Sequence, residues 1–159
     1  MENYICINGK KAELTEEQMK ALGLKLPKAS PFARAERYDK YYIISSYGGV
    51  NMATDYRDNF DDRAFNFANY CTDKSIMEQR ELHETLNRLL WRYSMEHKAK
   101  GQSPFEICYD YKIKRWECMS VSERYNYFGS PRFDSFEIAK NAIEEIIKPF
   151  IAEHPDFVW

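Results

Sequence analysis

Three histidines are the first candidates for catalysis or metal binding: His83, His97 and His154. His83-Glu84 begins like the zinc-protease motif H-E-x-x-H, but Asn87 stands where that motif needs its second histidine. His97 falls at the expected end of a helix, where the helix dipole favours a cation. We therefore expect solvated or half-buried imidazoles, and predict no metal site that uses them.

Four aspartates between positions 55 and 62 are the second candidate group: Asp55, Asp58, Asp61 and Asp62. Clustered carboxylates can bind a divalent cation, but Asp-Asn-Phe-Asp-Asp lacks the EF-hand spacing and no Glu closes the loop at its twelfth position. A solvated acidic loop is the favoured interpretation. Such a loop could contact a partner, with its carboxylates standing in for nucleic-acid phosphates.

Other catalytic signatures do not occur in the sequence. It contains no G-x-S-x-G elbow, Walker loop or G-x-G-x-x-G, and Gly48-Gly49 is its only glycine pair. The cysteines, which we expect to be reduced thiols, form no C-x-x-C pair: Cys6, Cys71, Cys108 and Cys118. We predict a protein that is not an enzyme and has no cofactor, and keep a metal-free hydrolase as a remote third possibility.

A basic and aromatic stretch is the third candidate group. Residues 109–116 read YDYKIKRW and offer six candidate contact residues: Tyr109, Tyr111, Lys112, Lys114, Arg115 and Trp116. Aromatic rings beside cations suit base stacking and phosphate contacts in single-stranded nucleic acid. An ordinary strand with aromatic residues inward and lysines protecting its edge would have the same composition, and the sequence leaves both interpretations open.

Composition limits the classes of protein that this chain can form. Its 159 residues carry 23 Lys+Arg against 25 Asp+Glu, a near-neutral balance that argues against a protein coating nucleic acid. The 16% aromatic content exceeds what a disordered chain carries. No apolar run approaches the ~20 residues that span a bilayer. The start, Met1-Glu2-Asn3-Tyr4, resembles no secretory signal, so we expect a cytoplasmic protein.

The elements that must position these residues begin with a small N-terminal unit, residues 1–24. Strands at 4–7 and 10–14 flank Asn8-Gly9, a pair that favours a two-residue hairpin turn. Thr15 and Gln18 have the spacing of a helix capping box, and Gly23 is suited to end that helix. Residues 25–40 are expected to form a connector that lies over the main domain.

The main domain, residues 41–159, is predicted as two strand-rich halves, 41–100 and 101–159, that each close with a helix. Strands are expected at 41–46, 50–57, 65–68, 105–114, 116–121 and 125–128. A helix from about 74 to 97, capped by Thr72, and a last helix, capped by Asp134 with Glu137, show apolar residues at helical spacing. Pro149 should kink or end the last helix.

The predicted fold class is therefore α+β. We expect one antiparallel sheet of about five to seven strands, with the two amphipathic helices on one face and the other face partly solvated. The N-terminal hairpin and short helix are added to this domain. Phe157 and Trp159 in the tail are expected to pack onto it.

Three segments of the chain resemble a known family. They are the opening ICINGKKAELTEEQMKALGL, residues 69–97 (NYCTDKSIMEQRELHETLNRLLWRYSMEH) and residues 136–159 (FEIAKNAIEEIIKPFIAEHPDFVW). They are similar to small proteins encoded by phages, prophages and mobile elements of Firmicutes, including gut bacteria. These are helix and cap sequences, so the resemblance implies kinship and assigns no site residue.

The resemblance implies an accessory gene of a mobile element that acts in a bacterial cytoplasm. Such proteins often bind host machinery, and some inhibit CRISPR or other defence systems. The leading hypothesis is a non-catalytic accessory protein that binds and inhibits a host or defence-system protein, in the manner of an anti-CRISPR. The alternative is a nucleic-acid- or nucleotide-binding accessory protein that uses the 109–116 stretch.

Overall fold

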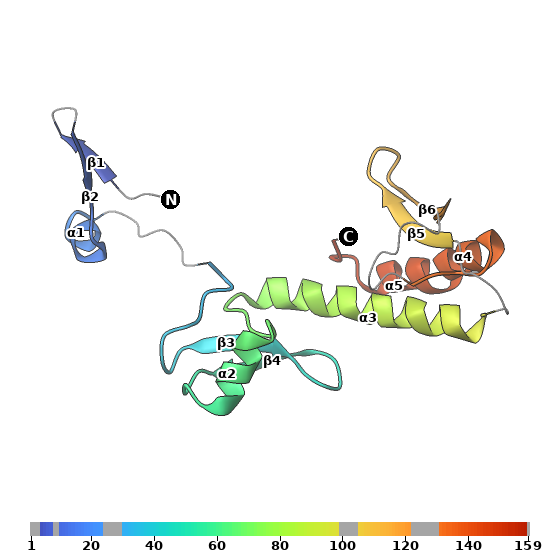
Figure 1. Ribbon diagram of the computed structural model, residues 1–159, viewed down its shortest axis with the longest axis horizontal. Helices are drawn as coiled ribbons and strands as arrows, with labels where there is room; N and C mark the ends of the chain where they lie inside the picture. Colours follow the sequence, from blue (N-terminus) through green and yellow to red (C-terminus); the bar gives the residue numbers. More distant parts are fainter. Residues whose placement is uncertain (1–3, 8–9, 24–29, 99–104, 122–130, 159) are drawn as a thin grey trace. The chain divides into compact units, whose positions relative to one another are not determined.

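A computed structural model describes residues 4–7, 10–23, 30–98, 105–121 and 131–158 (Figure 1). The chain divides into two compact units, Met1–Ala33 and Arg34–Trp159. The boundary lies inside the expected connector, so residues 34–40 belong to the second unit.

The first unit is a hairpin followed by a short helix. Strands β1 (Tyr4–Ile7) and β2 (Lys10–Glu13) pair antiparallel, and α1 spans Glu16–Ala21. Thr15 and Gln18 form the predicted capping box, because the Gln18 amide donates to Thr15 Oγ1 at 3.3 Å and the Thr15 amide donates to Gln18 Oε1 at 2.9 Å. Gly23 follows the helix with a φ of +65°, which glycine adopts without strain.

The second unit begins with a hairpin covered on both faces. Strands β3 (Lys40–Ile44) and β4 (Val50–Thr54) pair antiparallel, and α2 spans Asn59–Asn66. Side chains alternate along each strand, so one face packs with α2 and Tyr70 and the other packs with the start of the next helix. The first face carries Tyr41, Ile43 and Ala53, and the second carries Tyr42, Ile44 and Val50.

The long helix α3 (Lys74–Glu96) confirms the predicted helix and connects two groups of elements. Its N-terminal part contacts β3 and β4, and its later turns contact α4 and the segment that follows α4. Asp73 caps it in place of Thr72, with Asp73 Oδ1 accepting from the Ser75 amide at 2.9 Å.

The remaining elements form the second group. They are β5 (Phe105–Asp110), β6 (Arg115–Ser120), α4 (Phe136–Ala142), a π-helical segment (Ile143–Ile147) and α5 (Lys148–Glu153). The last helices pack along the later turns of α3, and the β5–β6 hairpin packs on α4. Ser135 caps α4, so the expected cap at Asp134 is wrong by one residue. The helix continues past Pro149 to Glu153, so the proline does not end it. The π-helical segment ends just before Pro149, with the Lys148 amide donating to the Ile143 carbonyl five residues back.

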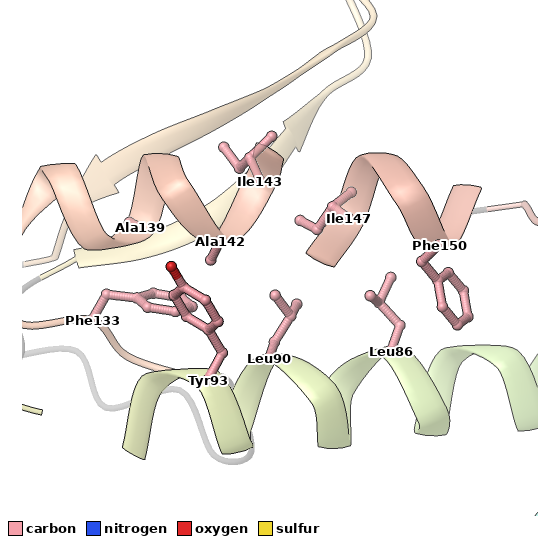
Figure 2. Close-up of a cluster of buried hydrophobic side chains, with 9 residues drawn as sticks. All are labelled: Leu86, Leu90, Tyr93, Phe133, Ala139, Ala142, Ile143, Ile147 and Phe150. Atoms are coloured by element: carbon pink, nitrogen blue, oxygen red, sulfur yellow. The ribbon is translucent and has the colours of Figure 1, made fainter. Parts of the chain in front are cut away.

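The main hydrophobic core lies between α3 and the last helices. Figure 2 shows side chains of α3 directed toward those of α4, the π-helical segment and α5. Its buried members are Leu86, Leu90, Tyr93, Phe133, Ala139, Ala142, Ile143, Ile147 and Phe150. The two predicted helices supply most of these residues. Their packing against each other confirms that the apolar residues at helical spacing form buried faces.

The expectation of one sheet with five to seven strands is wrong. In the described residues, the strands form three separate two-stranded antiparallel sheets, and the fold is α+β. Alternation fixes which face of a strand is buried but not which strand lies across its edge. The β3–β4 and β5–β6 hairpins each bury apolar side chains without pairing with each other. Residues 65–68 end α2 and do not form a strand, and the strand expected at 125–128 lies outside the described residues.

Candidate functional site

Two of the four candidate aspartates are buried, which contradicts the expectation of a solvated acidic loop. Asp55 is 0% exposed and Asp61 is 2% exposed. Asp58 is exposed and caps α2, with Oδ1 accepting from the amides of Phe60 at 2.8 Å and Asp61 at 3.0 Å. Asp62 is half-exposed and lies 2.6 Å from Arg34 Nη1. The contacts of all four aspartates thus stabilise the local fold.

Asp55 lies at the centre of a hydrogen-bond network built from distant parts of the second unit. Arg34 Nε donates to its Oδ2 at 3.0 Å, and Arg34 Nη2 donates to Oδ1 at 3.3 Å. The Tyr70 hydroxyl donates to Oδ2 at 2.9 Å, and the Arg57 amide donates to Oδ1 at 2.9 Å. A buried carboxylate is tolerated only when paired and hydrogen-bonded in this way.

Asp61 is held by a parallel set of donors. The Tyr41 hydroxyl donates to Oδ1 at 2.6 Å, and the amides of Tyr56 and Asp58 donate to Oδ2 at 2.7 and 3.2 Å. The rings of Tyr41 and Tyr70 stack with centroids 4.1 Å apart, which joins the two carboxylate sites. We call these four residues, Tyr41, Asp55, Asp61 and Tyr70, together with Arg34, the aspartate network.

The charges of the network shift its pKa values. Burial alone raises the pKa of Asp55, but the hydrogen bonds from Arg34, Tyr70 and the Arg57 amide outweigh burial, so this pKa lies below its usual value. The pKa of Asp61 is lowered in the same way by Tyr41 and the backbone amides, against burial. Burial raises the pKa of Tyr70 to about 12. The hydrogen bond from the Ala35 amide lowers this pKa, and the hydrogen bond to Asp55 and its negative charge raise it. At neutral pH the carboxylates are therefore ionised and the phenols neutral.

A hollow with exposed aromatic side chains lies beside this network, and the sequence analysis missed it. It has a volume of about 690 Å³ and is bounded by residues of β3, the β3–β4 turn, β4, α2 and Asn69. Three large aromatic residues at its wall are exposed, namely Tyr47 at 100%, Phe60 at 57% and Phe67 at 75%. Phe60 and Ala64 of α2 and Phe67, the residue that directly follows this helix, recur at helical spacing, a pattern that could have indicated this surface. We call Tyr47, Phe60 and Phe67 the aromatic rim.

The hollow has one charged side chain among its lining residues, Arg63. Arg63 is exposed and belongs to the last turn of α2. The polar remainder of the lining includes the amides of Asn51, Asn59 and Asn69. The Asn69 side chain already makes two hydrogen bonds within the fold. It accepts from the Ile44 amide and donates to the Ile44 carbonyl, both at 2.9 Å. Aromatic rings around a cation and amides are typical of a protein-binding surface.

The basic and aromatic candidates cluster at the tip of the β5–β6 hairpin. The expected strand to residue 114 ends at Asp110, and Tyr111, Lys112 and Lys114 lie in the turn. Tyr109 packs edge-on against Tyr111 and Trp116, with ring centroids 5.2 and 5.1 Å away. Arg115 pairs with Glu117 at 2.6 Å. The two lysines are exposed at the tip.

The histidines contact backbone carbonyls or aromatic rings. The ring of His154 packs against Phe150, with centroids 4.6 Å apart. His83 Nε2 lies 2.8 Å from the Val158 carbonyl, and its ring packs against Phe157 with centroids 4.7 Å apart. His97 Nδ1 lies 2.9 Å from the Tyr93 carbonyl. Phe157 packs on the main core as predicted, whereas Trp159 lies outside the described residues.

The thiols and acidic groups form no metal centre where side chains are described. In these parts of the chain, no group of three or more His, Cys, Asp or Glu side chains is placed to hold a metal ion. Cys71, Cys108 and Cys118 are free cysteines. Burial and neighbouring carboxylates raise the pKa of Cys108, which disfavours the reactive thiolate.

Across the described ranges, none of the helices combines the length and the apolar character needed to cross a membrane. No family model, curated protein or solved structure matches this chain.

Proposed function

We propose that this chain is a non-catalytic accessory protein that binds and inhibits a host protein, through the aromatic rim around the hollow. The observation that carries the proposal is the exposure of three large aromatic residues around one concave surface. The resemblance to phage and mobile-element proteins supports a bacterial host protein as the partner, including one of a defence system. Inhibition would follow because the bound chain covers a surface that the host protein needs for its activity.

The aspartate network supports this role by fixing the surface before binding. Asp58 and Asp61 form the cap of α2, which carries Phe60 of the rim and ends directly before Phe67. Asp61 also accepts a hydrogen bond from Tyr41 of β3. A preformed surface loses less conformational entropy on binding than a mobile one. Aromatic residues at the centre of such surfaces supply most of the binding free energy in known interfaces.

Phe60→Ala is expected to weaken partner binding by roughly 30-fold or more, the loss typical of a central aromatic contact of ~2 kcal/mol. The full-length chain, immobilised in host lysate, should first recover a stoichiometric partner. Titration of that partner against the purified wild type and variant by calorimetry then gives the two dissociation constants.

Phe136→Ala is the matched control, because Phe136 is 53% exposed and also lies in the first turn of a helix, away from the hollow. Its partner affinity should stay within twofold of the wild type. Recovery of no partner by the wild-type chain contradicts the proposal. Equal affinity of the Phe60→Ala variant rejects the rim as the contact surface.

A second candidate function is binding of single-stranded nucleic acid by the β5–β6 tip. The specific observation in its favour is that exposed Lys112 and Lys114 flank a packed group of three aromatic rings. Rings and cations in one place suit stacking on bases and contacts with phosphates.

The double variant Lys112→Glu/Lys114→Glu tests this second function. If the tip binds a single strand, the wild type should retard a labelled oligonucleotide at low salt, and the variant should do so only at a much higher protein concentration. Loss of two phosphate contacts should also reduce the slope of log K against log salt by about 1.4. Absence of retardation of the wild type at low ionic strength eliminates this candidate.

A further inference from the structure

The outer edge of β4 carries backbone groups that point away from β3. Tyr42 of β3 exchanges both of its backbone hydrogen bonds with Cys71, at 2.7 and 3.1 Å, and Ile44 exchanges both of its own with the Asn69 side chain. On β4, Met52 lies opposite Tyr42 and Val50 lies opposite Ile44. In an antiparallel ladder such pairs are non-hydrogen-bonded, so the N–H and C=O groups of Val50, Met52 and Thr54 point outward.

Other parts of the chain cover the remaining sides of this hairpin. Its faces pack with α2 and α3, and the edge of β3 is covered by Asn69 and Cys71. The edge of β4 has no backbone partner among the described residues. Met52 at its centre is 56% exposed. The outer edge of β4 is thus the open edge of this hairpin.

The sequence of β4 lacks the features that protect a free edge. Val-Asn-Met-Ala-Thr contains no charge and no proline, whereas edge strands are commonly shielded by lysine, proline or a bulge. An antiparallel pairing of β4 with itself would place Met52 opposite Met52 of the second copy and Val50 opposite Thr54. All of these contacts are neutral, so the edge is complementary to itself.

We propose that β4 pairs antiparallel with β4 of a second copy of this chain across a two-fold axis at Met52. The two hairpins then form one four-stranded sheet in which the outward N–H and C=O groups of both edges are paired. Self-complementarity favours this occupant over a foreign strand, because the same neutral patch satisfies both sides of an isologous contact. The aromatic rim is not required for this pairing, so the inference is independent of the proposed function.

Introducing a charge of either sign at Met52 tests the dimer through its two-fold symmetry. By sedimentation velocity, the full-length wild type is expected to be a dimer, and Met52→Lys and Met52→Glu are each expected to weaken it at least tenfold, because like charges then face each other across the axis. Mixing the two variants should restore a dimer, since Lys then faces Glu. Circular dichroism establishes that each variant is folded.

Met119→Lys is the matched control. Met119 is 54% exposed in β6, opposite Glu106 of β5. This variant should sediment like the wild type. A monomeric wild type at high micromolar concentration overturns the proposal, and so does a dimer that both Met52 variants leave intact. If each variant alone is monomeric and the mixture is dimeric, position 52 of one copy must face position 52 of the other. If the mixture also remains monomeric, the two-fold pairing is rejected.

Discussion

Asp55→Ala is expected to lower the free energy of unfolding by about 3–5 kcal/mol, the cost of breaking a buried ion pair by removing one partner. The substitution leaves the Arg34 guanidinium and the Tyr70 hydroxyl without their shared acceptor, in a site where Asp55 itself is fully buried. Urea denaturation of the full-length wild type and variant, followed by circular dichroism, measures the difference.

Asp62→Ala is the control for this experiment, because Asp62 pairs with the same guanidinium at 2.6 Å but its side chain is 48% exposed. Its loss should cost less than about 1 kcal/mol, as solvent-exposed pairs do. Equal losses for the two variants would contradict the expectation that burial makes Asp55 the more important partner of Arg34.

The same network gives the stability of the protein a defined dependence on pH. Because the pKa of Asp55 is lower in the folded state than its ordinary value of 3.8, its ionised form stabilises the protein above pH 4. This contribution is lost as the pH falls through the lowered value. Asn at position 55 cannot ionise, so the difference in unfolding free energy between the wild type and Asp55→Asn should shrink below pH 4 and stay constant from pH 5 to 8.

The parts of the fold predicted from sequence are those that depend on neighbouring residues. The capping box of Thr15 and Gln18 and the stripe of Leu86, Leu90 and Tyr93 are local patterns, and both are confirmed. The arrangement of hairpins was not predictable in this way. Whether β4 joins another strand depends on what covers its edge, and no periodicity of its own five residues contains that information.

The candidate site shows the same division between local and distant determinants. Asp58 and Asp61 have the spacing of a capping box, so the start of α2 could have been predicted from these two residues. The burial of Asp55 could not, since it depends on Arg34 and Tyr70, which are 21 and 15 residues away in the sequence. Four aspartates in eight residues resemble a solvated loop until these partners are known.

Phe133→Ala is expected to cost about 3–5 kcal/mol, the range for truncation of a fully buried aromatic residue. Phe133 is 1% exposed, lies in the core formed by α3 and α4, and exchanges backbone hydrogen bonds with Phe105 at 3.2 and 2.9 Å. Its backbone therefore holds β5, while its ring packs among the side chains of the helices, where the truncation leaves a cavity (Figure 2). Phe67→Ala removes the same atoms from a side chain that is 75% exposed and should change the free energy of unfolding by less than about 0.5 kcal/mol. Urea denaturation of both variants measures the contrast, and similar losses would show that Phe133 does not contribute to the core as its position indicates.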